Sequence, residues 1–238
     1  EMLRSLVGSE MCIRDSYNYH KGMKGIIQEL KVLLKTKSIG TNSDRALLLD
    51  FQATLEIKPE KAIKLEKDAL AQIENITADN ARLVSNLHAN LGGLYRMNGH
   101  PDLAREHMEK SISLLDQFNL LHINDSIPQI ANYAMFLTEQ QEPERGISEL
   151  QKLSGIIKEY HSDDCLDYAK VQETLGTIYL MTANLPQAKT HFKRAFKIYE
   201  KIWADEPEMI EAKYQEIQEL YPQIGFCIGK NLSGLLTK

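Results

Sequence analysis

The pair His100 and His107 comes closest, by residue type and spacing, to a metal site in this sequence. A spacing of seven residues places two side chains on one face of an α-helix, and imidazole nitrogens are common zinc ligands. Proline favours the first turn of a helix, so Pro101 is expected to begin a helix and to leave His100 in the turn before it. We therefore expect His100 to be a solvated loop residue and predict no metal site.

The remaining candidates for catalysis do not assemble into a nucleophile, a base and an orienting group. The sequence contains no glycine-rich phosphate loop, no GxSxG motif and no HExxH motif. His88 and His122 are expected to be partly buried or to cap helices. The adjacent Asp163 and Asp164 are interpreted as a helix N-cap rather than as a pair of catalytic carboxylates. The sequence therefore predicts a protein that is not an enzyme and has no cofactor.

The charge and cysteine content suggest the partners and the compartment. A net charge of −5 gives no reason to expect nucleic acid, because duplex binders present a basic face. The lysine-rich stretch from Lys21 to Lys37 is interpreted as a solvated helix face. No apolar run approaches the ~20 residues that span a bilayer. Cys165 and Cys227 form no CxxC motif, so we expect packing roles in a reducing, cytoplasmic environment.

A repeat of forty-two residues organises the chain. Leu91-Gly92-Gly93-Leu94-Tyr95 and Leu175-Gly176-Thr177-Ile178-Tyr179 lie 84 residues apart, and a degenerate copy, Tyr133 to Leu137, lies between them. Further positions recur at the same interval. They are small residues at Ala62, Ala104, Gly146 and Ala188; prolines at Pro59, Pro101 and Pro143; and large apolar residues at Met108, Leu150 and Phe192. Small side chains at a fixed interval let antiparallel helices approach closely, and hairpins must then stack to bury their apolar faces.

These residues resemble the tetratricopeptide repeat. Leu175, Gly176, Tyr179, Ala188 and Phe192 match its pattern nearly fully, and the forty-two-residue interval is similar to that of kinesin-light-chain repeats. The resemblance covers roughly residues 43 to 221; it is strong in the second and fourth copies, weak in the third, and weakest in the first, where Asp50 replaces glycine. It implies an all-α fold, a right-handed α-solenoid of antiparallel helical hairpins.

The expected helices follow from the repeat and from local start and stop signals. They are a lone helix at about 20–36; pairs at about 43–57 with 59–75, 79–97 with 101–118, 125–140 with 143–160, and 164–183 with 186–203; and a last helix at about 205–221. The repeats are thus about 43–75, 79–118, 125–160 and 164–203, with a partial copy at 205–221. Ser43-Asp44, Asp125-Ser126 and Ser162-Asp163 are the expected N-caps. Asn98-Gly99 is expected to end a helix.

The two ends of the chain are expected to lie outside the repeat array of residues 17–221. Leu6 to Ser16, LVGSEMCIRDS, resembles a translated transposase-type sequencing adapter, so residues 1–16 are interpreted as artefactual and the chain as a fragment. Residues 222–238 are expected to be a truncated or frayed half-repeat.

The family resemblance implies that first helices line a concave groove that binds a protein or peptide. Asn90 and Asn132 share one groove position, with Thr174 in the fourth copy. An asparagine amide both donates and accepts hydrogen bonds, so it can hold a peptide backbone. Helical spacing adds further residues to this face. The whole predicted groove comprises Asn86, Asn90, Arg96, Met97, Asn132, Met135, Lys170, Thr174 and Thr177.

Two other functions remain in competition with a peptide-binding scaffold. The chain is alternatively the sensor or regulatory region of a larger bacterial signalling protein or transcription regulator, from which an upstream domain has been cut. An enzyme is the third hypothesis, and it would rest on His88 or His107. The identity of the partner, the pathway and the oligomeric state are not determined by the sequence.

Overall fold

A computed structural model describes residues 32, 41–123 and 126–220 of the chain. The expected helix at 20–36, the adapter-like residues 1–16 and the tail 222–238 fall outside these residues, apart from the single position Val32. The chain divides into two compact units, the first ending at His107 and the second beginning at Met108. Each unit is built from α-helices, and the part of the chain that the structure describes has no strand.

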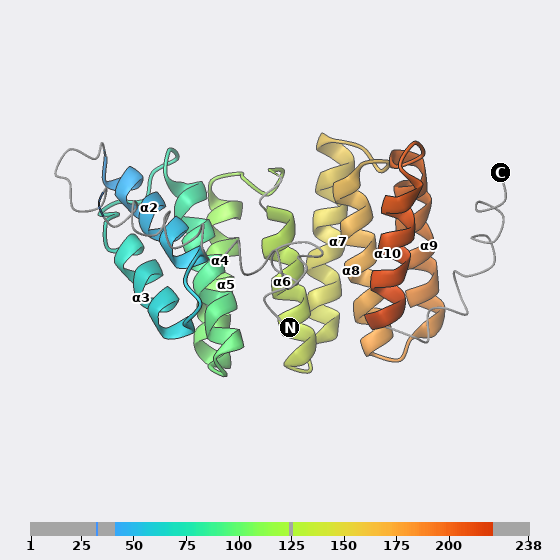
Figure 1. Ribbon diagram of the computed structural model, residues 1–238, viewed down its shortest axis with the longest axis horizontal. Coiled ribbons are helices and arrows are strands. Elements are labelled where there is room, and N and C mark those ends of the chain that lie inside the picture. Colours follow the sequence, from blue (N-terminus) through green and yellow to red (C-terminus); the bar gives the residue numbers. More distant parts are fainter. Residues whose placement is uncertain (1–31, 33–40, 124–125, 221–238) are drawn as a thin grey trace. The chain divides into compact units, whose positions relative to one another are not determined.

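The described helices come in antiparallel pairs, as the repeat predicts. In order they are α2 (Asn42–Thr54), α3 (Pro59–Leu70), α4 (Ala81–Met97), α5 (Pro101–Gln117), α6 (Ser126–Glu139), α7 (Pro143–Tyr160), α8 (Leu166–Met181), α9 (Leu185–Ile202) and α10 (Pro207–Leu220). Within the first unit, α2 packs on α3 and α3 on α4; within the second, α6 packs on α7, α7 on α8 and α8 on α9 (Figure 1). The all-α prediction is confirmed.

Three of the second helices begin where the prolines predict, at Pro59, Pro101 and Pro143. The predicted N-caps are less accurate. Thr41 caps α2, and its hydroxyl accepts a hydrogen bond from the Asp44 amide, whose own carboxylate accepts one from the Thr41 amide at 2.7 Å. The predicted cap at Ser43-Asp44 was therefore two residues too late, because Asp44 completes a capping box rather than starting it.

The cap of α8 also differs from the prediction. Cys165 occupies the N-cap position, where its thiol accepts a hydrogen bond from the Tyr168 amide at 3.4 Å. Asp163 and Asp164 precede the helix, and Asp164 instead pairs with Lys201 of α9. The Asp164 carboxylate thus contacts α9, while the Ser162 hydroxyl accepts a hydrogen bond from the Asp164 amide at 3.0 Å.

α3 ends at Leu70, five residues before its expected end. A loop follows in which the Asn80 side chain accepts a hydrogen bond from the Thr77 amide at 2.8 Å and donates one to the Asn75 carbonyl at 2.9 Å. These side-chain bonds replace helical backbone bonds, which is how asparagine competes with a helix.

The turn inside each of the last three hairpins repeats with the sequence interval. Gly99, Gln141 and Ala183 are forty-two residues apart, and all have positive φ angles, of 75°, 64° and 58°. The amide after each turn residue donates to a carbonyl five residues earlier in the chain, as His100 does to Tyr95 at 2.9 Å. This left-handed helix ending needs no side chain, so glycine suits it best. The prediction that Asn98-Gly99 ends a helix is confirmed.

The small residues lie where the two helices of a hairpin cross. A Cβ added to Gly146 would lie 2.6 Å from the carbonyl oxygen of Ala134, and one added to Gly176 would lie 2.8 Å from the Phe192 ring. Ala104 and Ala188 are buried. In the second and fourth copies the first helix carries the glycine and the second helix the alanine, as Gly92 with Ala104 and Gly176 with Ala188. In the third copy the order is reversed, with Ala134 on the first helix and Gly146 on the second. In the third and fourth copies the close approach therefore rests on one glycine.

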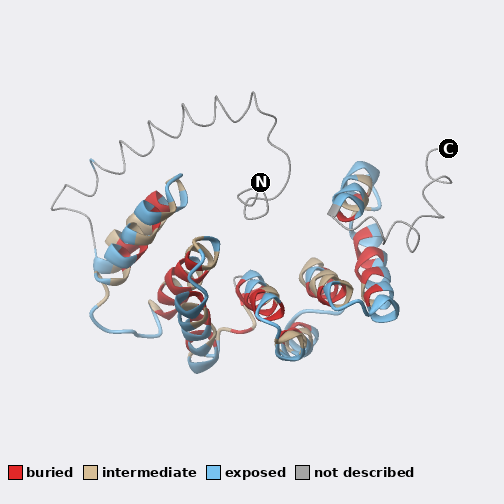
Figure 2. Ribbon diagram, turned by 90° about the horizontal axis from the view of Figure 1, so that it is seen from below, coloured by how far each residue is buried: buried red, intermediate tan, exposed pale blue. Residues whose placement is uncertain are grey.

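Each unit buries its own apolar residues on the sides of the helices that face their neighbours (Figure 2). In the second unit a continuous core includes Leu150, Leu175, Phe192 and Tyr199, each no more than 1% exposed. In the first unit Ala46, Ala69 and Leu87 form a smaller cluster between α2, α3 and α4. Hydrophobic burial between successive helices thus stabilises both units.

Candidate functional site

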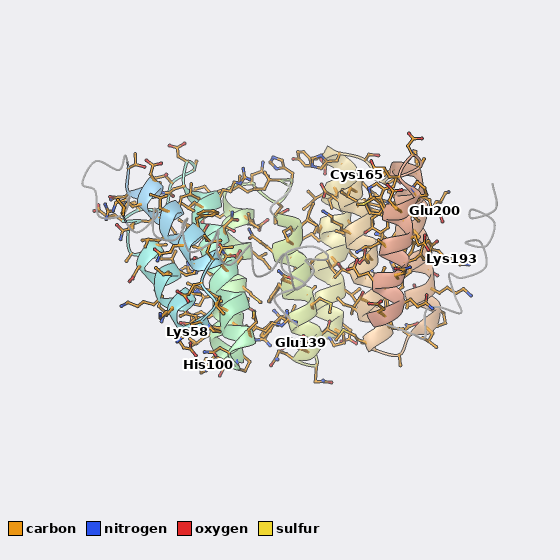
Figure 3. The ribbon with its side chains drawn as sticks, in the orientation of Figure 1. Lys58, His100, Glu139, Cys165, Lys193 and Glu200 are labelled. Atoms are coloured by element: carbon orange, nitrogen blue, oxygen red, sulfur yellow. The ribbon has the colours of Figure 1, made fainter. Side chains whose placement is uncertain are left out.

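The first helices of the second unit lie side by side and run in the same direction. Glu139, the last residue of α6, and Cys165, which precedes α8, lie at opposite ends of the unit (Figure 3). α6 and α8 are also in contact. We therefore expect residues at matching repeat positions to lie in rows across the two helices. This geometry is what a shared binding face requires.

Five predicted groove residues lie on these two helices. Asn132 on α6 is exposed, and Met135 is half-buried with part of its side chain against the core. On α8, Lys170 is exposed and lies 3.9 Å from Asp167. Thr174 and Thr177 are half-buried, and their hydroxyls donate to helix carbonyls one turn earlier, at 3.0 and 3.1 Å. That the five face one partner stays a prediction.

The remaining four predicted residues lie on α4 of the first unit. Asn90 is exposed, but its amide nitrogen donates to the Asp50 carboxylate at 2.8 Å, so this part of its hydrogen-bonding capacity is already used. Asn86 and Arg96 are half-buried and also interact with other groups. Met97 ends the helix and is 36% exposed.

The repeat position of Arg96 offers little exposed surface in the second unit. Its equivalents in the second unit are Thr138, which is buried and bonded to the Ala134 carbonyl, and Leu180, which packs against the core. Asn90, by contrast, has the exposed Asn132 as its equivalent. The two positions therefore offer different amounts of surface to a partner.

Phe51 is a surface residue that sequence reasoning missed. It lies at the same repeat position as Met135 and Thr177, and it is 48% exposed on α2. Leu47, one helical turn before it, is 54% exposed. Counting back by forty-two residues from Met135 through Gly93 leads to Phe51 and would have identified it as a groove position. The first copy matches the repeat poorly, so the predicted groove did not include it.

An acidic pair, in which Glu66 is buried and Asp50 half-buried, also lies in the first unit. Glu66 on α3 is 2% exposed and lies beside the Asp50 carboxyl of α2 and the Asn90 amide of α4. Burial, reinforced by the charge of Asp50, raises the pKa of Glu66 to about 9. Burial also raises the pKa of Asp50, although hydrogen bonds from Glu66 and Asn90 oppose the shift. The pair therefore retains a proton at neutral pH.

The structure brings together two histidines whose contact the sequence did not predict. His107 contacts His88 rather than His100, with 2.8 Å between their Nδ1 atoms, and its ring stacks on Tyr95. The fourth copy repeats this arrangement at the same positions: His191 contacts Gln172 at 2.9 Å and stacks on Tyr179. The glutamine replacement indicates that the pair joins the two helices of a hairpin. His100 is exposed, as expected.

A partly buried ion pair connects the last described helix of the second unit to its neighbours. Lys213 of α10 lies 2.9 Å from a carboxylate oxygen of Glu173 on α8, and the Tyr199 hydroxyl of α9 donates to the other oxygen at 2.6 Å. Burial and the charge of Glu173 raise the pKa of Tyr199. Burial alone would lower the pKa of Lys213, but Glu173 and Glu216 raise it above its usual value. The three helices are thus joined by a charged network.

The described residues also bear on metal binding and on membrane insertion. Among the described residues no group of three or more histidine, cysteine or acidic side chains is placed to hold a metal ion. None of the described helices combines the length and the apolar character needed to cross a bilayer.

Comparison with known proteins supports the repeat assignment. Residues 126–201 match the tetratricopeptide repeat family. The fold resembles BtubC (BKLC) from P. vanneervenii, with a TM-score of 0.63 and 19% identity over 76% of this chain and 72% of that one.

Two further structures are similar. Kinesin light chain TPR-like repeats of Podosopora anserina give a TM-score of 0.65 at 13% identity, over 79% of this chain and 92% of theirs. MamA gives a TM-score of 0.53 at 16% identity, over 81% of this chain and 98% of its own. No curated protein matches the sequence significantly. The resemblance to kinesin-light-chain-like tetratricopeptide repeats is confirmed at the level of the fold.

Proposed function

We propose that this chain, a tetratricopeptide-repeat protein over residues 126–201, binds a protein or peptide on the exposed face of its first helices. Tetratricopeptide repeats are generally non-catalytic scaffolds that mediate protein–protein interactions. The observation that supports the proposal is the contact between α6 and α8, the helices on which the forty-two-residue interval matches Asn132 with Thr174 and Met135 with Thr177.

The residue types on α6 and α8 suit an extended chain. The exposed Asn132 amide offers two donors and an acceptor to a peptide backbone. Met135 is flexible and half-exposed, so it adapts to different apolar side chains. Lys170 is exposed, and its distance of 3.9 Å from Asp167 makes that ion pair weak. It therefore remains available to a carboxylate of the partner.

The test uses peptides selected from a random library displayed on phage and panned against the full chain. A variant combining Asn132→Ala, Lys170→Ala and Thr177→Ala removes three groups from the first helices. A matched control combining Gln151→Ala, Lys152→Ala and Ser148→Ala removes similar groups from the exposed side of α7. Fluorescence anisotropy of a labelled selected peptide measures the affinity, and far-UV circular dichroism checks the fold.

We expect the α6–α8 variant to bind the peptide about tenfold more weakly or worse, since it loses several polar contacts. The α7 control should keep the original affinity, and both should keep their helical content. Equal affinity of all three proteins would show that the first helices do not form the binding face.

A further inference from the structure

The first repeat differs from the others at one packing contact. In the second, third and fourth copies a small residue on the first helix is matched with a large apolar residue on the second helix. These pairs are Gly92 with Met108, Ala134 with Leu150, and Gly176 with Phe192. In the fourth copy the contact is direct, since a Cβ on Gly176 would lie 2.8 Å from the Phe192 ring. The first copy has Asp50 and Glu66 at these positions.

Packing does not require this acidic pair, because the third and fourth copies form the same helical crossing with apolar side chains. Burying two carboxyl groups is also costly unless they are neutralised or paired. Glu66 is 2% exposed, and its Oε2 atom has no hydrogen-bond partner among the described residues. A buried, unsatisfied oxygen at an unnecessary carboxyl pair points to a ligand that would satisfy it.

The cluster meets the solvent at the exposed Asn90 and the half-buried Asp50. The Asn90 amide nitrogen donates to the Asp50 carboxylate at 2.8 Å. Leu47 lies one helical turn before Asp50 and one turn before Phe51, and both Leu47 and Phe51 are exposed. Asp50, Glu66 and Asn90 therefore form a polar cluster beside an exposed apolar patch.

The charge of the cluster favours a cation. Within the described part of the chain, neither Asp50 nor Glu66 forms an ion pair with a lysine or arginine. In the free protein a retained proton neutralises Glu66, because burial and, second, the charge of Asp50 raise the pKa of Glu66. A lysine or arginine side chain supplies both a positive charge and several hydrogen-bond donors, so it can replace that proton.

We propose that Asp50, Glu66 and Asn90 form a binding site for one lysine or arginine side chain of the partner, with the exposed Leu47 and Phe51 contacting its neighbouring apolar residue. The inference rests on the proposed function and adds a preferred chemistry to it. A protein-derived cation fits better than a metal ion, since the cluster offers few ligands and an adjacent apolar patch.

The repeat supplies a variant that should still fold. Asp50→Ala with Glu66→Leu installs the pair that the third copy has at Ala134 and Leu150. The matched control, Asp68→Ala, removes one exposed carboxylate from α3, which equals the negative charge lost with an acidic pair that retains a proton. Circular dichroism and the unfolding midpoint confirm that each protein is folded.

The experiment titrates peptides selected on the full chain, each in its original form and with its lysines and arginines replaced by glutamine. We expect the selected peptides to share a basic residue. The Asp50→Ala/Glu66→Leu variant should bind the original peptide about tenfold more weakly than the control, and should bind the glutamine form as the unchanged protein does.

Several outcomes overturn the inference. If selected peptides lack a shared basic residue, or bind the acidic-pair variant as tightly as the control, the cluster does not recognise a cation while the proposed function stands. If no peptide is selected, the proposed function fails and this inference fails with it. If calcium chloride alone raises the unfolding midpoint, and only when the acidic pair is present, the site belongs to an inorganic cation.

Discussion

At position 66 a glutamate occupies a place that the later repeats give to methionine, leucine or phenylalanine. In the free protein this carboxyl group is held neutral, since burial and the charge of Asp50 raise its pKa to about 9. The native state therefore binds a proton that the unfolded chain, with an ordinary glutamate pKa, releases. This single residue links the stability of the first unit to pH.

We predict that the free energy of unfolding of the first unit falls as the pH rises from about 4.5 to about 9, by up to about 1.4 kcal/mol per pH unit. The sign follows because the native state holds more protons than the unfolded state between these pKa values. Glu66→Gln keeps the size and a hydrogen-bond donor, and it should flatten this dependence. Urea unfolding followed by circular dichroism at several pH values measures it; an unchanged slope in Glu66→Gln would contradict the assignment.

At the scale of helices, the hairpin turn is the feature that the repeats share most closely. Gly99, Gln141 and Ala183 adopt the same left-handed conformation at the same interval, although glycine alone adopts it without a steric cost. The backbone hydrogen bonds that close the turn are also repeated. The third and fourth copies therefore keep the turn conformation of the second, although Gln141 and Ala183 tolerate a positive φ less well than Gly99.

Ala183→Gly should accordingly stabilise the second unit by about 1 kcal/mol, because it removes the strain of a side chain at positive φ. The reverse change, Gly99→Ala, should destabilise the first unit by a similar amount. A Cβ at Gly99 would meet no atom within 4 Å, so the cost there comes from the backbone alone. Urea midpoints of the two variants would disagree with this account if both shifted in the same direction.

On the scale of the whole molecule, each of the two units has a core of its own. The chain's one tryptophan, Trp203, stacks on Tyr199 in the second unit, so its fluorescence reports on that unit. In the same unit Phe192 fills the space opposite Gly176 and is 1% exposed. Unfolding of the second unit can therefore be followed on its own by the fluorescence of Trp203.

Phe192→Ala should lower the stability of the second unit by about 3–5 kcal/mol, because it opens a cavity in a closely packed core. The fluorescence of Trp203 during urea unfolding is the measurement. The control is Phe51→Ala, which truncates a 48% exposed side chain in the first unit and should leave the Trp203 transition nearly unchanged. A small effect of Phe192→Ala would mean that the core contact with Gly176 is not rigid.

The sequence by itself determined the repeat interval, the helix order and most helix boundaries. These depend on small residues, prolines and turn residues whose effects act within a few residues or recur at a fixed spacing, as Pro143, Gly146 and Gly99 illustrate. It also predicted exposed Asn132 and buried Ala188 from register alone. Local physics was sufficient for these features.

Only the tertiary structure decided which side chains meet across helices. The contacts of His88 with His107, of Lys213 with Glu173, and of Asn90 with Asp50 join residues that are 19 to 40 positions apart. Such contacts depend on side-chain rotamers, on burial and on which other partners are near. The spacing of residues in the sequence does not predict them. Cys165, for the same reason, caps α8 while the neighbouring Asp164 pairs with Lys201 of α9.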